Sequence, residues 1–181
     1  MEDDVKKKTI NSFISVDPGL KGGLCLWNVA TNLPRIQDLI DMPVMKAPTG
    51  KTVVDPDAVW AWISEAEADL LVQENVVMAG GKGKMAIISA GYNLGLFDGI
   101  TSALNTPMVV VHPITWQSKM LPGLKERKAH KQAAALLVAE SFPSIAYRLY
   151  GSRGAIKDGL ADAIVIGMWY LGMSGVSGVK P

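Results

Sequence analysis

The fold is decided by the stretch Phe13-Ile14-Ser15-Val16-Asp17-Pro18-Gly19 near the start of this 181-residue chain. Residues 12–16 are rich in β-forming side chains, and Asp-Pro-Gly is a turn sequence. The stretch therefore predicts a short strand that ends at Asp17 and reverses. Residues 22–29 and, with a weaker pattern, 35–44 predict two further strands, so we expect the chain to open with a three-stranded meander.

The rest of the chain alternates helices and strands. Asp55 is the expected N-cap of a helix that begins at Pro56 and runs to about residue 68. The remaining expected elements are a strand at 70–77, a helix at 85–104, a strand at 107–112 and helices at 125–141 and 158–172. This order predicts an α/β fold in which helices flank a mixed five-stranded sheet, and it resembles the order of the ribonuclease H-like fold.

Composition indicates one globular domain over residues 1–181, because the chain is 49% hydrophobic and 19% charged. Residues 1–11 are expected to form a flexible tail that lacks the pattern of a secretory signal. The single cysteine, Cys25, excludes an internal disulfide. The longest apolar stretch, residues 160–176, contains Asp162 and three glycines, a composition that is unfavourable for a membrane-spanning helix. We therefore expect an intracellular protein of the cytoplasm or nucleoid, with a viral or organellar origin left open.

The charge of the chain is small overall but unevenly distributed. Net charge is +1, yet residues 52–74 hold six acids and no lysine or arginine, whereas residues 112–157 hold eight lysines and arginines against two acids. Such polarity predicts a basic face that could follow a polyanion. A solvated basic helix would give the same pattern.

Four carboxylates occupy unusual places in the pattern. Asp17 and Glu74 end apolar runs, and Asp158 and Asp162 flank the start of a third. A carboxylate at the end of a buried element costs desolvation free energy unless a cation meets it. Since no single basic residue stands beside each acid in sequence, we expect a divalent-metal site assembled from distant segments, which is chemistry suited to hydrolysis of phosphate esters.

Three segments resemble the signature blocks of RuvC-like Holliday junction resolvases. They are Phe13-Ile14-Ser15-Val16-Asp17-Pro18-Gly19, Glu74-Asn75-Val76-Val77-Met78-Ala79 and Asp158-Gly159-Leu160-Ala161-Asp162-Ala163. Their order and spacing match those of the family, and the similarity covers residues 12–172. The resemblance implies an endodeoxyribonuclease that resolves four-way DNA junctions by paired, metal-dependent hydrolysis of phosphodiester bonds.

The resemblance also implies a set of catalytic residues around two Mg²⁺ ions per site, for which Mn²⁺ could substitute. Asp17 would anchor the metals from the centre of the sheet and Glu74 would ligate from the neighbouring strand. Asp158 and Asp162, four residues apart on one helix face, would complete the cage. Lys131 would support the transition state.

Asp158 has a competing structural explanation. An acid at the start of a helix is a favoured N-cap. Bacterial resolvases space the paired acids three residues apart, whereas Asp158 and Asp162 are four apart. Asp162, inside an otherwise apolar helix, is therefore the stronger candidate ligand.

Six lysines are candidates for DNA contact: Lys82, Lys84, Lys119, Lys125, Lys128 and Lys131. The match implies that Lys119 and Lys131 approach the scissile phosphate, whereas Lys125 and Lys128 suit backbone contacts. Lys82 and Lys84 lie in a glycine-rich loop that lacks the P-loop ending and that approaches the junction centre in the family. All six could instead be solvated surface charges. Bacterial members carry an aromatic wedge where this chain has Val77, and Met78 is a weak substitute.

The glycines at 91, 95 and 99 leave one helix stripe without side chains. Packing on the sheet would use such a stripe, but the resemblance implies a homodimer through it, with two active sites facing opposed strands of branched DNA.

Two functional alternatives stay open: a nuclease of the same fold that cuts flaps and forks, and a junction-binding protein without turnover. A sugar kinase of the actin type would need two domains, which the length excludes.

Overall fold

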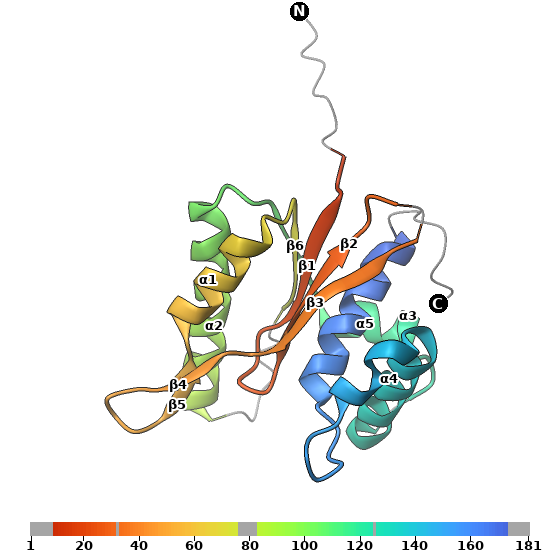
Figure 1. Cartoon of the computed structure of the whole chain (residues 1–181). Helices are drawn as coiled ribbons and strands as arrows, with labels where there is room; N and C mark the ends of the chain where they lie inside the picture. The colour runs from red at the N-terminus through yellow and green to blue at the C-terminus, as the bar shows by residue number, and fades with distance from the viewer. Residues whose placement is uncertain (1–8, 32, 76–82, 125, 174–181) are drawn as a thin grey trace, which may run out of the picture.

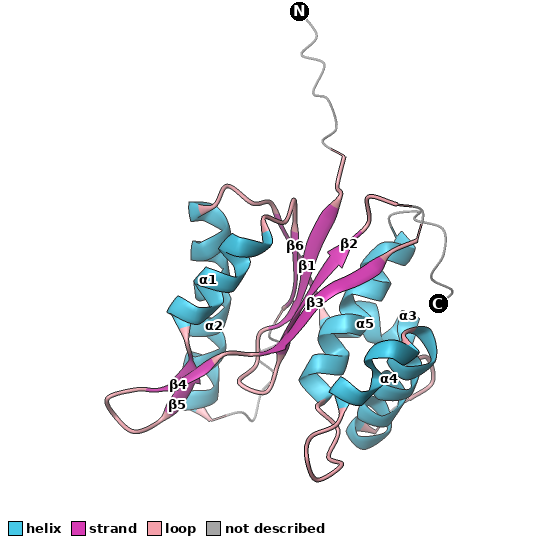
Figure 2. Cartoon of the chain, viewed as in Figure 1, coloured by secondary structure: helices cyan, strands magenta, loops and turns pink. Residues whose placement is uncertain are grey.

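Strand β1 (Ser12–Asp17) lies at the centre of a five-stranded sheet with the order β3-β2-β1-β6-β7 (Figures 1 and 2). It pairs antiparallel with β2 (Gly23–Asn28), which pairs antiparallel with β3 (Arg35–Asp41). On its other side β1 pairs parallel with β6 (Leu71–Glu74), which pairs parallel with β7 (Met108–Val111). The expected mixed five-stranded sheet is confirmed.

The structure is a computed structural model that describes residues 9–31, 33–75, 83–124 and 126–173. Helices cover both faces of its sheet (Figure 1). One face carries α1 (Pro56–Ala66) and α2 (Lys84–Ala103). The other carries α3 (Pro113–Met120), α4 (Arg127–Ser141), the 3-10 helix η1 (Pro143–Leu149) and α5 (Asp158–Met173). Among the described residues no helix is long and apolar enough to cross a membrane.

Alternation along β1 divides the core into two layers. Ile14 and Val16 pack into a cluster with residues of α1 and α2, whereas Phe13 packs into a cluster with residues of α3, α4 and α5. Because successive side chains point to opposite faces, Asp17 belongs to the face of Phe13. The last residue of β1 therefore points toward the layer that contains α5.

Helix α1 begins as the sequence predicts. Asp55 Oδ1 accepts hydrogen bonds of 3.1 Å from the backbone N–H groups of Asp57 and Ala58, and Pro56 is the first helical residue. Pro56 has no N–H to leave unpaired at this position. The helix ends at Ala66 because Glu67 adopts a left-handed conformation with φ of 45°.

The structure contains three elements that the sequence prediction lacked: a separate hairpin, α3 and η1. The third predicted strand, 35–44, divides: β3 ends at Asp41, and after Pro43 the chain forms a separate hairpin of β4 (Val44–Lys46) and β5 (Thr52–Val54). Pro43 has no N–H for a ladder, and its carbonyl accepts from Asp55 N at 2.9 Å. The other two are α3 and η1. Within the predicted strand 70–77, β6 covers Leu71–Glu74, and residues 76 and 77 lie outside the described residues.

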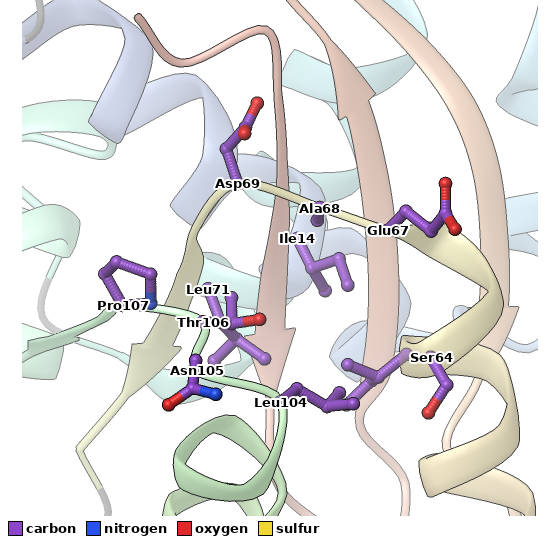
Figure 3. A pocket seen from close by; sticks show the side chains of 11 residues that line it. Ile14, Ser64, Glu67, Ala68, Asp69, Leu71, Leu104, Asn105, Thr106 and Pro107 are labelled. Carbon is purple, nitrogen blue, oxygen red and sulfur yellow. The ribbon is translucent and has the colours of Figure 1, made fainter. Parts of the chain in front are cut away.

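A cavity of about 400 Å³ lies where β6 and β7 begin, at the end of the sheet remote from Asp17 (Figure 3). Ile14, Leu71 and Leu104 contribute apolar surface, and Glu67 and Asp69 lie at its border. Asp69 Oδ2 accepts from the backbone N–H groups of residues 11 and 12, at 2.9 and 3.3 Å. This acid therefore ties the start of β1 to the start of β6.

Candidate catalytic centre

Two of the predicted acids stand side by side at the carboxyl ends of neighbouring strands. Asp17 is the last residue of β1 and Glu74 the last residue of β6. The strands are parallel and Val16 pairs with Gln73, so the next residue of each strand, an acid in both cases, follows in register. Both side chains alternate toward the face that α5 covers. The sequence therefore folds these carboxylates into one place because it ends two adjacent strands with them.

Helix α5 brings the other two acids against this edge. Asp158 is its first residue and Asp162 lies one turn later. A Cβ added to Gly159 would lie 2.0 Å from the carbonyl oxygen of Lys21, and one added to Gly22 would lie 1.9 Å from the carbonyl oxygen of Asp17. The start of α5 thus meets the β1–β2 turn backbone to backbone, which only glycine permits.

A short chain of hydrogen bonds holds α5 in this position. Trp27 Nε1 donates to Ser15 Oγ at 2.8 Å, and Ser15 Oγ donates to the carbonyl oxygen of Ala163 at 2.6 Å. Ser15 is fully buried and lies two residues before Asp17, while Ala163 directly follows Asp162. The bond therefore fixes the separation between the two elements that carry these acids.

The crowding of the carboxylates raises two of their pKa values. Burial, followed by the charges of Asp17, Glu74 and Asp158, raises the pKa of Asp162 to about 8, and Lys131 partly offsets this rise. Burial also raises the pKa of Asp17 to about 6; its hydrogen bond from Gly19 N–H lowers the value, and the charge of Asp158 adds to the rise. The four acids and Lys131 consequently form one electrostatic cluster.

Lys131 forms an ion pair with Asp158 across the α4–α5 contact. Asp158 is the first residue inside α5, and the carbonyl of Lys157 before it accepts from Leu160 N and Ala161 N, each at 3.1 Å. The carboxylate of Asp158 thus turns toward α4 and the cluster. The helix-cap explanation of this acid does not describe the observed contact.

Glu74 has a partner that the sequence prediction missed. Trp116 Nε1 of α3 donates to Glu74 Oε1 at 2.9 Å, and the Trp116 side chain is buried. His112 caps α3 by accepting from Ile114 N at 3.3 Å, and Pro113 is its first residue. The pair His-Pro after a strand is the signal that could have predicted this helix.

The described candidate DNA-binding lysines form two groups: those exposed on helix surfaces, and Lys131, which contacts the acid cluster. Lys84, Lys119 and Lys128 are exposed on α2, α3 and α4. Among the described lysines of the predicted set, only Lys131 pairs with one of the four acids. Lys82 and Lys125 lie outside the described residues, as do Val77 and Met78.

The residues present fit a hard divalent cation. All four candidate ligands are carboxylates, the donors that Mg²⁺ prefers. Burial, and then neighbouring carboxylates, raise the pKa values of Asp17 and Asp162, and a bound cation would favour the ionised forms of both. Among the described residues, no three His, Cys, Asp or Glu side chains already converge in the arrangement of a ligand shell. The four carboxylates therefore lie at one edge of the sheet, but they do not yet converge on a single position that a metal ion could occupy.

Solved structures of two resolvases have the same architecture. The chain is 14% identical to Thermus thermophilus RuvC in complex with a Holliday junction substrate, with 91% of this chain and 97% of that chain covered and a TM-score of 0.56. It is 14% identical to the fowlpox virus Holliday junction resolvase, with 90% and 99% covered and a TM-score of 0.59.

No protein-family model and no curated protein sequence matches the chain. The structural matches extend over almost the whole length of both resolvases. They confirm the fold that the three acid-containing segments predicted. The chain has the ribonuclease H-like fold of RuvC and of other Holliday junction resolvases.

Proposed function

We propose that this protein is a structure-selective DNA endonuclease that resolves four-way junctions by paired, Mg²⁺-dependent hydrolysis of phosphodiester bonds. The observation that carries the proposal is the gathering of Asp17, Glu74, Asp158 and Asp162 with Lys131 at one edge of the sheet. The fold adds support, because the Thermus thermophilus structure that shares it contains a Holliday junction substrate.

Each residue of the cluster has a role in this proposal. The four carboxylates hold the divalent ions, two per site, with Asp17 on the central strand as the shared anchor. Bound Mg²⁺, or Mn²⁺ in its place, supplies Lewis-acid stabilisation of the charge that develops on the phosphate oxygens. Trp116 keeps Glu74 oriented through its N–H donor. Lys131 places a positive charge beside Asp158, where the scissile phosphate would lie.

The proposed substrate is branched DNA. Lys84, Lys119 and Lys128 are exposed on three different helices, and Lys82 and Lys125 belong to the same set by sequence. Lysines of this kind contact phosphates without reading the base sequence. Selectivity for a junction then depends on presenting two cleavage sites at once.

We propose that two copies pair through α2. Ile88 and Tyr92 on this helix are 61% and 52% exposed, and a Cβ added to Gly95 or Gly99 would meet no described atom within 4 Å. The glycine stripe thus faces away from the sheet, so packing on the sheet does not account for it. An exposed apolar face with a side-chain-free stripe suits close approach of the same helix from a second copy.

The test is cleavage of a synthetic four-way junction beside a linear duplex of the same sequence, with and without Mg²⁺. We expect symmetric nicks in the junction, intact duplex, and no cleavage in a chelator. Asp17→Asn and Asp162→Asn should each reduce the cleavage rate at least a hundredfold, because each removes an ionised ligand.

The control is Glu67→Gln, which removes an exposed acid beside the cavity remote from Asp17 and should cut at the parent rate. Flaps and forks cut as fast as the junction would make the protein a broader branched-DNA nuclease. Binding of the junction without nicking would make it a junction-binding protein. Full activity of Asp17→Asn would overturn the catalytic assignment itself.

A further inference from the structure

The β4–β5 hairpin contributes none of the four acids, yet it begins beside them. Met42 N donates to the carbonyl oxygen of Gly22 at 3.0 Å, so the chain leaves β3 in contact with the β1–β2 turn that supports Asp17 and α5. The hairpin then pairs Val44 with Val54 and Lys46 with Thr52. In Figure 1 it projects from the same end of the sheet as the start of α5, on the side away from α4.

A cavity of about 390 Å³ connects the hairpin to the acid cluster. Its lining includes Val44, the first residue of β4, and Asp158, the first residue of α5. Leu20 and Ile156 give it apolar walls, and Lys21 also lines it. Asp158 is thus a wall of this cavity and a member of the cluster at the same time. The volume is within the range of pockets that hold a molecule the size of one nucleotide.

The hairpin beside this cavity is basic, whereas the lining of the cavity balances Lys21 and Lys157 against Asp41 and Asp158. Residues 43–54 contain Lys46 and Lys51 and no acid, and both lysines are exposed. Lys157 also lines the cavity, where it pairs with Asp41 at 2.6 Å. The described lining of the cavity at the other end of the sheet is acidic, with Glu67 and Asp69 and no lysine or arginine, and no lysine-bearing hairpin of the described residues adjoins it. Of the two cavities, the one beside Asp158 is the one that suits a polyanion.

The geometry of the hairpin determines where Lys46 lies relative to the cavity. Side chains two residues apart on a strand share a face, so Lys46 lies on the face of Val44, about 7 Å further from the cavity along the strand. That is about two nucleotide steps along a stacked DNA strand. Lys46 Nζ donates to Thr52 Oγ1 at 2.9 Å, which holds it over the hairpin.

We propose that this surface binds the DNA strand on the side of the scissile phosphate opposite α3 and α4. The cavity beside Asp158 holds the adjoining nucleotide, and Lys46 and Lys51 contact the phosphates that follow it. The inference rests on the proposed nuclease function and adds a second DNA-binding surface to the lysines of α2, α3 and α4. It makes the β4–β5 hairpin a DNA-binding arm.

The test measures binding of a fluorescent four-way junction and a linear duplex by the Asp17→Asn protein over a series of salt concentrations. Adding Lys46→Gln and Lys51→Gln together should weaken binding about tenfold and reduce the slope of log affinity against log salt by about 1 to 2. Arg35→Gln, which removes an exposed charge at the start of β3, is the control and should leave the slope unchanged.

A cross-linking experiment checks the position of the strand. Cys25 is fully buried, so Thr49→Cys at the hairpin tip provides an accessible thiol for a photo-cross-linker. We expect cross-links about two to four nucleotides from the cleavage position. Thr31→Cys, exposed in the β2–β3 turn, should give none there.

The outcomes separate the two proposals. If the parent nicks junctions while the double lysine variant binds like Arg35→Gln, the hairpin surface is wrong and the nuclease function stands. If the parent binds DNA without nicking it, the nuclease function fails and the lysine variants still decide the surface. If the parent binds no DNA at any salt concentration, both are overturned.

Discussion

Asp162 is an acid whose ionisation the fold strongly disfavours. Its pKa is about 8 when folded, against 3.8 for an ordinary Asp, because it is buried among three other acids. Between these values the folded protein binds a proton that the unfolded chain has lost. The free energy of unfolding should therefore fall as pH rises from 4 to 8. A cation bound at this site, as proposed above, would reduce that loss of stability.

Asp162→Asn should remove most of that pH dependence, and the raised pKa of Asp17 leaves the remainder. In chelator, we expect the variant to match the parent near pH 4 and to exceed its unfolding free energy by up to about 5 kcal/mol at pH 8. Urea unfolding at both pH values measures the difference, which added Mg²⁺ should reduce. Glu67→Gln, an exposed acid, should track the parent throughout. Equal stability of parent and Asp162→Asn at pH 8 would contradict the crowding described above.

Trp116→Phe should distinguish the role of Trp116 in orienting Glu74 from its contribution to stability. The change keeps most of the buried ring and removes the N–H that donates to Glu74. Trp62→Phe is a matched control, because Trp62 Nε1 donates to Asp38 Oδ2 at the same distance of 2.9 Å, away from the acid cluster. Both should lose about 1 to 2 kcal/mol in urea unfolding. Only Trp116→Phe should slow junction cleavage, about tenfold.

Single residues were predictable where their place in a local pattern was unusual. Asp17 and Glu74 end apolar runs, so the sequence marks them without reference to the fold. Trp116, the partner of Glu74, carries no such mark, and Lys131 was named only through the resemblance to the resolvases. The contacts of Trp116 with Glu74 and of Lys131 with Asp158 depend on how α3 and α4 pack against α5, and therefore on the whole core.

At the scale of elements, docking of α5 on the β1–β2 turn completes the acid cluster. Gly159→Ala should place a methyl group against the Lys21 carbonyl and cost more than about 2 kcal/mol. Gly172→Ala in the same helix meets no described atom and should gain up to about 1 kcal/mol. Thermal unfolding compares them, and a Gly159→Ala protein as stable as the parent would place α5 elsewhere.

The elements themselves were mostly predictable. Asp55-Pro56 marks the start of α1 by a cap and a fixed backbone angle, both of which are local properties. The β4–β5 hairpin was missed because residues 35–44 form an almost continuous β-like run, although Pro43, which has no N–H for a ladder, marks locally where the run divides. Helix α3 was missed although its His112-Pro113 start is local.

At the scale of the whole molecule, the α2 face predicts self-association. Tyr92→Glu should convert a dimer to a monomer and change paired nicking of a junction to single nicks, because a charge would be buried in the proposed interface. Leu136→Glu on α4, where Leu136 is 59% exposed, is the matched control and should stay dimeric. Sedimentation of both proteins, with a cruciform plasmid as substrate, measures the two effects. A monomeric parent that still makes paired nicks would refute the interface.

The general architecture of the sheet followed from the alternation of strands and helices, whereas the placing of charge over the molecular surface did not. The sequence indicated one basic region, 112–157. The fold adds Lys46 and Lys51, which directly precede the acidic stretch 52–74 in sequence, because the hairpin separates them from the acids of α1. The average charge of a stretch of sequence does not show that neighbouring residues are separated in the folded molecule.

The position of helix α5 in the sequence determines when, during synthesis, the acid cluster can form. It supplies Asp158 and Asp162 to a cluster whose first member, Asp17, belongs to the first strand. During synthesis the N-terminal strands leave the ribosome long before this helix. A growing chain therefore lacks the complete set of acids until residue 162 has been translated. Under the proposed nuclease function, chains that end before α5 should not cut DNA.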